Sequence, residues 1–581
     1  MLFRSTPENT DAPIFPVYPE SRGVSSLWFR HALKRVLNAG AHGIEDPIPS
    51  AIREKYRLPS LDTALVWIHA PERLSHAEAA RKRFAFEEMF VLQIQKALDR
   101  LENDTRTAFP VNEGEKFART FLKSLPFRST HAQQRAIHDI LRDFKKQHPM
   151  ARLLEGDVGS GKTAVAAATA YAIVNSRPPE RTSGTLQIAY MAPTEILAQQ
   201  HFQSFIEYFK NLPINIALMT GSGCKKFPSK AHRHKATSIS RAQLLKWIAN
   251  GEIAMLVGTH ALIQKSVVFQ HLAYCIVDEQ HRFGTRQRAA LLQKPSPMHA
   301  KPVPHFLSMT ATPIPRTLAL TMYGDLDLSI LDELPPGRTT ITTEIVRSSH
   351  RTQAYERMRS ELKKGRQAYV VCPRIEEPDP QKEHAVQAKS AKAEAARLQK
   401  DIFPEYEIGL LHGAMKPAEK DAVMARFACG KTHVLVATSV VEVGINVPNA
   451  TVILIEGAER FGLAQLHQLR GRVQRSSHPP MCFLVSDTAS HTSTTRLRAL
   501  AHSSDGFKLA EIDLKTRGAG DLWGKKQWGI SDIGMDALQN IRLIRAAREE
   551  ATRVVQSDPH LTNHRALRAR ISSLAEKLHE E

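Results

Sequence analysis

Eight consecutive residues have the spacing of a loop that binds phosphate groups. They are Gly156, Asp157, Val158, Gly159, Ser160, Gly161, Lys162 and Thr163, and they fit the pattern Gly-x-x-x-x-Gly-Lys-Ser/Thr. In such a loop the glycines allow a tight turn, so that successive backbone N–H groups point at phosphate oxygens. Lys162 would reach the β- and γ-phosphates, and the Thr163 hydroxyl would bind Mg²⁺. The pattern predicts a nucleotide-binding site; the alternative is a glycine-rich turn with an incidental lysine.

A second candidate site is the acidic pair Asp278 and Glu279, which follows an apolar run at residues 273–277. The Asp278 carboxylate can hold Mg²⁺, usually through water. Glu279 can orient or deprotonate an attacking water molecule. Acidic pairs also occur in surface loops, but this pair shares a chain with a phosphate loop. That combination favours hydrolysis of a nucleotide.

Three arginines, Arg470, Arg472 and Arg475, lie close together in the second half of the chain. Cleavage of a γ-phosphate spreads negative charge over its oxygens, and an arginine finger stabilises that charge strongly. If these residues belong to a second lobe, Arg472 and Arg475 reach the nucleotide only when the lobes close. Hydrolysis would then open and close the lobes, as in a motor that moves along a strand. The alternative is a patch that contacts a phosphate backbone.

The elements that must position these residues alternate between strands and helices. A strand ends at residues 153–154 and a helix follows at 164–174, with further strands predicted at 186–192, 214–219, 253–257, 273–277 and 306–309. A second alternation predicts strands at 368–371, 408–411, 434–437 and 452–455. Such alternation is typical of parallel, doubly wound sheets, which bind ligands at the carboxyl ends of their strands. The sequence therefore predicts an α/β protein with two such units.

The regions outside these two alternations read mainly as helices. Residues 14–19 resemble a lone strand, which would need a sheet that the chain does not supply nearby. Residues 24–105 are predicted to be mostly helical, with the longest helix at about 76–103. Residues 381–400 are expected to form an exposed helix or a floppy insertion, and the tail from Met535 is expected to be helical.

The composition indicates a large, basic, multidomain protein. The chain has 581 residues, of which 42% are hydrophobic and 24% are charged, and its net charge is +20. So large a surplus favours a polyanionic partner such as nucleic acid, although a generally basic surface is the alternative. The segment at residues 222–241 has six cationic side chains and no acid, which suits a solvated loop and a phosphate contact equally well.

Five scattered cysteines include no Cys-x-x-Cys pair, so we expect no zinc module and a reducing compartment. The first residues lack the apolar run of a signal peptide, and no stretch is long and apolar enough to span a membrane. A cytoplasmic protein with no membrane partner is therefore expected.

The motifs resemble, in order, those of superfamily 2 helicases: the phosphate loop and residues 191–195, 278–281, 310–312 and 468–475. More narrowly, residues 278–284, 458–463 and 516–521 resemble RecG-type branched-DNA helicases, and the last of these matches the TRG translocation element of that family. The resemblance implies two tandem RecA-like parallel-sheet lobes, an N-terminal helical connector and a small, α-rich translocation element at the C-terminal end. The expected divisions are residues 1–20 (remnant of an OB-type wedge domain), 21–125 (connector), 126–340 (first lobe), 341–500 (second lobe) and 501–581 (translocation element and C-terminal helices).

The same resemblance implies the roles of individual residues. Gln133, whose amide can donate and accept hydrogen bonds, would contact adenine. Residues 156–163 would bind ATP, Thr163 and Asp278 would hold Mg²⁺, and Asp278 and Glu279 would drive hydrolysis. The residues expected to couple hydrolysis to movement are Gln280, His281, Thr310, Thr312, Glu442, Gly444 and Arg517. Gln468 would line the cleft between the lobes, with Arg472 and Arg475 as arginine fingers.

The function implied is that of an ATP-dependent helicase and translocase on double-stranded and branched DNA, in repair and recombination. It would act as a monomer, with single-strand-binding protein as a further partner. Two departures from the family pattern matter: the wedge domain is reduced to its last strand, and Gln474 stands where the family has glycine. Gln474 is expected to weaken ATP hydrolysis by displacing Arg475. A non-catalytic or weakened DNA-binding remnant and the motor of a transcription-repair coupling factor are the alternatives.

Overall fold

The computed structural model describes residues 2–4, 15–18, 25–38, 44–178, 184–229, 235–279, 302–312, 315, 318–319, 321, 324–335, 340–373, 391–438, 447–474, 478–487, 490–517, 531–538 and 540–579. The chain divides into two compact units. Unit 1 comprises Met1–Glu102, Pro315–Asp325 and Leu514–Glu581, and unit 2 comprises Asn103–Ile314 and Leu326–Asp513.

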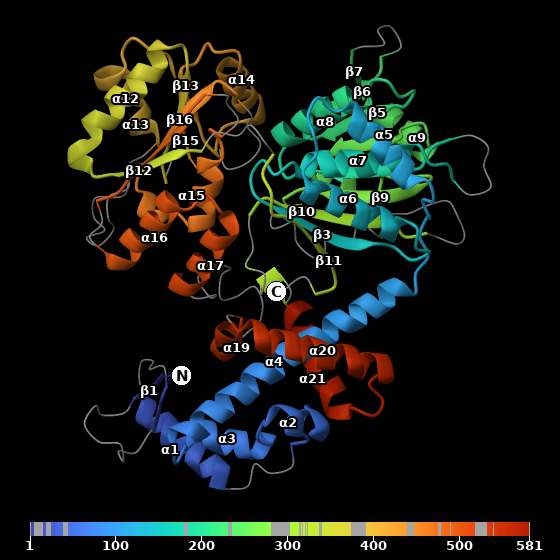
Figure 1. Cartoon of the computed structure of the whole chain (residues 1–581), viewed down its shortest axis with the longest axis vertical. Helices are drawn as coiled ribbons and strands as arrows, with labels where there is room; N and C mark the ends of the chain where they lie inside the picture. Colours follow the sequence, from blue (N-terminus) through green and yellow to red (C-terminus); the bar gives the residue numbers. More distant parts are fainter. Residues whose placement is uncertain are drawn as a thin grey trace. The chain divides into compact units, whose positions relative to one another are not determined.

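The first lobe of unit 2 is built on a sheet that, among the described residues, has nine strands in the order β11-β3-β10-β9-β4-β8-β5-β6-β7 (Figure 1). Seven strands are parallel: β3 (Ala151–Gly156), β4 (Gln187–Met191), β5 (Ile216–Thr220), β8 (Met255–Gly258), β9 (Leu272–Val277), β10 (His305–Thr310) and β11 (Asp327–Leu331). The antiparallel strands β6 (Gly223–Phe227) and β7 (Thr237–Ile239) extend one edge. Because parallel strands end at one edge of a sheet, the phosphate loop, the acidic pair and Thr310 come together there.

The helices of the first lobe are α5 (Gly114–Ser124), α6 (His131–Phe144), α7 (Lys162–Val174), α8 (Glu195–Phe209) and α9 (Arg241–Ala249). Helix α7 contacts α5, α6, β3, β4 and β9, which explains why its alanine-rich sequence is buried on nearly every side. Phe109, Val111 and Phe121 also pack into this core. The hydrophobic core of the first lobe therefore includes residues well before 126.

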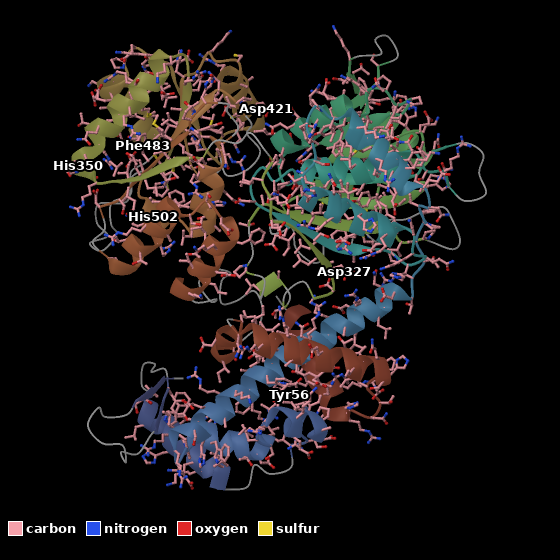
Figure 2. The ribbon with its side chains drawn as sticks, in the orientation of Figure 1. Tyr56, Asp327, His350, Asp421, Phe483 and His502 are labelled. Atoms are coloured by element: carbon pink, nitrogen blue, oxygen red, sulfur yellow. The ribbon has the colours of Figure 1, made fainter. Side chains whose placement is uncertain are left out.

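The second lobe is built on a parallel sheet whose described strands follow the order β12-β17-β16-β13-β15-β14 (Figure 1). The strands are β12 (Thr342–Val346), β13 (Gln367–Val371), β14 (Ile408–Leu411), β15 (Val434–Ala437), β16 (Ala450–Ile455) and β17 (Met481–Val485). Alternate residues face opposite cores: Cys482 packs with one cluster and Phe483, labelled in Figure 2, with the other. Burial on both faces explains why β15, β16 and β17 are almost continuously apolar rather than alternating, whereas the edge strand β12 is only partly buried and includes two threonines and a glutamate.

Each face of the second sheet is covered by its own helices. Residues of α12 (Arg351–Lys363) and α13 (Ala391–Arg397) pack on one face. Residues of α14 (Pro417–Ala428), α15 (Leu463–Arg470) and α16 (His491–His502) pack on the other. The two-lobed α/β architecture predicted from the alternating pattern is thereby confirmed.

Two local predictions for unit 2 need revision. Residues 391–402 are helical, as one of the two alternatives predicted, but they are not simply exposed, because Ala391 and Leu398 are fully buried in the second lobe; residues 381–390 lie outside the described part of the chain. The basic segment at 222–241 is not a simple loop, since it contains β6 and β7. Within β6, Lys226 is buried, donates to the Pro228 carbonyl at 3.0 Å and lies over the Trp247 ring.

Unit 1 is mainly helical, as predicted. Its described helices are α1 (Ser26–Asn38), α2 (Ser50–Tyr56), α3 (Leu61–His69), α4 (Leu74–Asp104), α19 (Asp532–Ala537), α20 (Ile541–Ser557) and α21 (Arg565–His579). The last two residues of α4 belong to unit 2. The prediction that the N-terminal strand lacks a partner is wrong, because β1 (Leu2–Arg4) pairs antiparallel with β2 (Phe15–Val17). No helix in the described part of the chain is long and apolar enough to cross a lipid bilayer.

Buried charges hold unit 1 together. The Arg83 guanidinium on α4 has no solvent exposure; it contacts the Glu87 carboxylate and lies 2.6 Å from an Asp46 oxygen. On α20, Glu550 accepts from the Lys55 ammonium at 2.5 Å and from the hydroxyl of Tyr56, labelled in Figure 2, at 2.9 Å. These pairs join segments that are far apart in the sequence.

Replacing Arg83 with methionine is expected to destabilise unit 1 by about 3–5 kcal/mol, because it removes the buried partner of the buried Glu87 carboxylate and of the half-buried Asp46 carboxylate. Urea unfolding followed by fluorescence measures the change. Arg81→Met is the control, since Arg81 forms an exposed pair with Asp536 at 2.9 Å. Equal destabilisation by the two substitutions would show that the buried cluster contributes nothing particular.

Candidate nucleotide-hydrolysis site

The phosphate loop joins β3 to α7 at the carboxyl edge of the first sheet. Gly161 precedes the first residue of α7 and has φ 87°, a backbone conformation that residues other than glycine rarely adopt. This turn brings the N-terminal end of α7 to the loop, where its free N–H groups and partial positive charge favour an anion. The local geometry is therefore suited to a phosphate group.

Lys162 lies inside this loop. Its ammonium donates to the carbonyl oxygen of Gly156 at 2.7 Å and to that of Asp157 at 3.0 Å, and the side chain is buried. A lysine held by its own loop places a fixed positive charge where phosphate oxygens would bind. Thr163 follows it in the first turn of α7 and is half-buried.

The Asp278 carboxylate is buried at the end of β9 and held on both oxygens. One oxygen lies 2.8 Å from His201 Nε2 and 3.5 Å from the Tyr190 hydroxyl, and the other accepts from the Glu279 N–H at 3.0 Å. Burial by itself would raise the pKa of Asp278, but the His201 hydrogen bond and charge and the Lys162 charge outweigh it and lower that pKa. Asp278 is therefore an anion with a fixed orientation.

Glu279 has the opposite electrostatic setting. Burial and the adjacent Asp278 charge raise its pKa above the usual range of glutamate, and the charges of Lys162 and Arg472 partly oppose that rise. Its backbone has φ 51°, an uncommon value for a residue with a side chain, and its carboxylate accepts from the Ala311 N–H at 3.3 Å. Two neighbouring carboxyl groups with separated pKa values suit a metal ligand and a general base.

The Ala311 contact links Glu279 to the segment after β10. There the Thr310 and Thr312 hydroxyls lie 3.0 Å apart, and the Thr312 N–H donates to the Thr310 hydroxyl at 3.3 Å. A displacement of the Glu279 side chain would therefore change the contacts of these two threonines. Both were predicted to couple hydrolysis to movement of the lobes.

Gln133 lies against the phosphate loop from the start of α6. Its side-chain N–H donates to the Ser160 carbonyl at 2.7 Å, and its side-chain oxygen accepts from the Thr130 N–H at 3.1 Å. The side chain is buried. Both polar atoms of the amide thus form hydrogen bonds within the protein. The predicted contact with adenine would therefore use the second lone pair of the amide oxygen or the second N–H of the amide nitrogen.

The second lobe meets the phosphate loop through the end of α15. His467 Nε2 lies 2.5 Å from an Asp157 oxygen, and the other Asp157 oxygen accepts from the Gly506 N–H at 3.3 Å. The backbone at Gly471 approaches so closely that a β-carbon there would lie 2.8 Å from a Val158 methyl. The segment that contains Arg472 is therefore directed toward the loop that contains Lys162.

Other predicted site residues are placed less fully. Gln468 and Arg472 are buried, and the Arg472 charge acts on Glu279. Arg517 ends helix α17 (Gly506–Arg517), but its side chain is not described. Gln280, His281, Glu442, Gly444 and Arg475 lie outside the described residues, so their roles stay predictions.

A magnesium ion suits the oxygen atoms of Thr163 and Asp278, because Mg²⁺ prefers hard oxygen ligands and keeps several of its waters. The lowered pKa of Asp278, which follows from the His201 and Lys162 charges despite burial, provides the required anion. In the part of the chain that is described, no group of three or more His, Cys, Asp or Glu side chains forms a metal site. The two residues would therefore hold Mg²⁺ together with water and nucleotide phosphates.

Three residues at the site were not predicted from the sequence: His201 and Tyr190, which hold Asp278, and His467, which contacts Asp157. The strand and helix containing Tyr190 and His201 are recognisable, but no local spacing indicates that these side chains meet Asp278 about eighty residues later. His467 immediately precedes the predicted motif at 468–475, and this proximity was the available signal.

Three family models match consecutive parts of the chain. Residues 130–321 match the DEAD/DEAH box helicase model, and residues 352–477 match the helicase conserved C-terminal domain. Residues 503–575 match the C-terminal part of domain 3 of ATP-dependent DNA helicase RecG.

Whole-chain comparisons agree with these matches. The chain is 43% identical over 568 residues to a Synechocystis protein named ATP-dependent DNA helicase RecG, and 41% identical over 558 residues to the Bacillus subtilis protein of that name. These alignments cover 97% and 96% of this chain, and 64% and 77% of the relatives. A solved structure of RecG bound to a three-way DNA junction matches with a TM-score of 0.71 and 38% identity, over 92% of this chain and 66% of that chain. The chain thus spans part of the length of each of these proteins.

Proposed function

Because this chain belongs to the RecG family of ATP-dependent DNA helicases, we propose that it hydrolyses ATP to move along double-stranded DNA and acts on branched DNA in repair and recombination. The observation that supports this most is the convergence of groups from both lobes on Glu279. Lys162 from the phosphate loop and Arg472 from the second lobe both act on that carboxylate. A site shared between lobes allows hydrolysis to change their relative position.

The proposed chemistry assigns each group one task. The loop N–H groups and Lys162 bind and orient the phosphates, and Arg472, with Arg475, stabilises the charge that develops on the γ-phosphate. Glu279, ionised, positions the attacking water and accepts its proton. Mg²⁺, when bound at Thr163 and Asp278, neutralises phosphate charge. Gln133 fixes the loop and contacts adenine.

The movement would reach DNA through the segments that follow the second lobe. The coupling residues proposed are Gln280, His281, Thr310, Thr312, Glu442, Gly444 and Arg517, and Gln468 lines the cleft between the lobes beside the reacting groups. The divisions predicted above, including a translocation element at 501–581, are part of this proposal. We further propose that the protein is a cytoplasmic monomer that works beside single-strand-binding protein.

Steady-state ATP hydrolysis tests the proposal, measured alone, with linear duplex DNA and with a three-way junction of equal length. We expect DNA to stimulate turnover, and the junction to be the better activator. Junction binding should weaken steeply as salt rises, because phosphate contacts release counterions. Absence of turnover would favour a non-catalytic DNA-binding remnant, and binding that is insensitive to salt would contradict a phosphate-dominated interface.

Gln474 provides a separate prediction about the end of the arginine segment. It is half-buried directly after Val473, which is fully buried. If its side chain and restricted backbone displace Arg475, Gln474→Gly should raise DNA-stimulated turnover several-fold, by about 1 kcal/mol of transition-state stabilisation. Gln474→Ala separates the two causes, because alanine removes the amide but keeps the β-carbon. Unchanged turnover in the glycine variant would refute the idea.

A further inference from the structure

The Asp157 carboxylate is the point at which the phosphate loop meets two different helices of the second half of the chain. One oxygen accepts from the Val158 N–H at 2.6 Å and lies 2.5 Å from His467 Nε2 on α15. The other oxygen accepts from the N–H of Gly506, the first residue of α17, at 3.3 Å. Burial alone would raise the pKa of Asp157, but the hydrogen bond and charge of His467, the Val158 N–H and the Lys162 charge together outweigh it and lower that pKa.

His467 is itself fixed from the opposite side. Its Nδ1 lies 2.8 Å from an Arg470 guanidinium nitrogen, and the same guanidinium donates to the Leu500 and Ser503 carbonyls at 2.6 and 2.9 Å. A guanidinium can only donate hydrogen bonds. Nδ1 of His467 is therefore the acceptor, and Nε2 donates its hydrogen to Asp157. Arg470 is therefore occupied in holding this ring.

Helix α17 is also tied to the start of α15. The Asp513 carboxylate on α17 accepts from the Leu463 N–H at 3.2 Å, and it pairs with Arg496 of α16 at 3.3 Å. Asp513 is fully buried. The helices α15, α16 and α17 are thus bound to one another by buried polar contacts, while Asp157 contacts this group from the phosphate loop at both α15 and α17.

We propose that Asp157 and His467 form a joint that transmits changes in the phosphate loop to α17, with His467 as a positioning residue. The Val158 N–H belongs to the loop that binds phosphate, so a bound phosphate competes with Asp157 for it. Asp157 then depends on His467 and Gly506 alone, and the phosphate charge repels its carboxylate toward them. This proposal rests on the proposed function and specifies one route by which the nucleotide site is coupled to α17. The route does not involve the arginine fingers.

Two substitutions of His467 separate the joint from general packing. In His467→Asn, the amide oxygen stands where Nδ1 stands and still accepts from Arg470, but the side chain is too short to reach Asp157. In His467→Gln, the amide reaches the Nε2 position and still donates to Asp157. His502→Asn on α16 is the matched control: His502, labelled in Figure 2, is exposed and contacts the Arg498 carbonyl.

Hydrogen–deuterium exchange of the α17 amides, with and without a non-hydrolysable ATP analogue, is the test. In the wild type, His467→Gln and His502→Asn, the analogue should change exchange at the start of α17; in His467→Asn it should not. Binding of the analogue should stay within a few-fold in all four proteins. The ratio of DNA-stimulated to basal turnover should fall about tenfold in His467→Asn, the scale of a typical coupling free energy.

The outcomes separate this inference from the proposed function. An equal change at α17 in the wild type and in His467→Asn overturns the joint, as does no change in the wild type with the analogue bound. Loss of analogue binding in His467→Asn also overturns it, because His467 would then act in nucleotide binding. A wild type without DNA-stimulated hydrolysis, but with the analogue-dependent change at α17, supports the joint and contradicts only the motor function.

Discussion

Replacing Lys162 with alanine is expected to lower ATP turnover by about 10²–10³-fold, the cost of removing one fixed group that stabilises transition-state charge. The ammonium is buried in the phosphate loop, where it donates to the Gly156 and Asp157 carbonyls. No neighbouring cation of that loop replaces it in this geometry. Turnover with saturating junction DNA measures the effect, and nucleotide affinity measured separately shows how much of it comes from binding.

Lys116→Ala is the control for the Lys162 substitution. Lys116 lies in the same lobe, is 76% exposed on its side chain and pairs only with nearby Glu113 at 3.5 Å among the contacts described. Its removal should leave turnover unchanged. If Lys162→Ala retains turnover within a few-fold of the wild type, the phosphate loop does not carry the reaction.

Replacing Glu279 with glutamine is expected to reduce turnover by about 10²–10⁴-fold while leaving ATP affinity nearly unchanged. Glutamine keeps the size of the side chain and the oxygen that accepts from the Ala311 N–H, but it cannot take a proton from water. Single-turnover hydrolysis and analogue binding separate the two effects. Glu207→Gln on α8, where the side chain is 63% exposed, is the control.

The pH dependence of turnover gives the Glu279 prediction a second readout. Burial and the Asp278 charge raise the pKa of Glu279, and a general base acts only when ionised. Turnover should therefore fall as the pH is lowered through this raised pKa, at a higher pH than an ordinary glutamate would give. If the decrease in turnover at low pH is the same in Glu279→Gln as in the wild type, another group is responsible for it.

The regular elements were predictable because each has a local cause. The strand before Asp278 is buried on both faces and is continuously apolar, and the helix after Lys162 is rich in alanine. The phosphate loop was identifiable because its chemistry depends on contiguous residues. The acidic pair was identifiable because it ends such a strand.

The remaining features depend on contacts that no local pattern records. Strand β7 has three residues in a basic segment and forms only because β6 offers an edge. The pairing of β1 with β2 likewise joins two strands of three residues each. His201 becomes a site residue only when α8 places it against Asp278. The engagement of Gln133 with Ser160 follows from the packing of α6 on the loop rather than from spacing.

The proposed motor requires that the two lobes share one nucleotide and that hydrolysis changes their separation. All five cysteines lie in the described chain, and Cys429, in the second lobe, is the exposed one. A label on Cys429 and another on a cysteine introduced at Glu207 in the first lobe report this separation by energy transfer. If the two lobes share one nucleotide, the distance should differ between a non-hydrolysable ATP analogue and ADP, and it should not differ in Lys162→Ala. The same distance with both nucleotides, when both are bound to the wild type, would contradict the proposed motor.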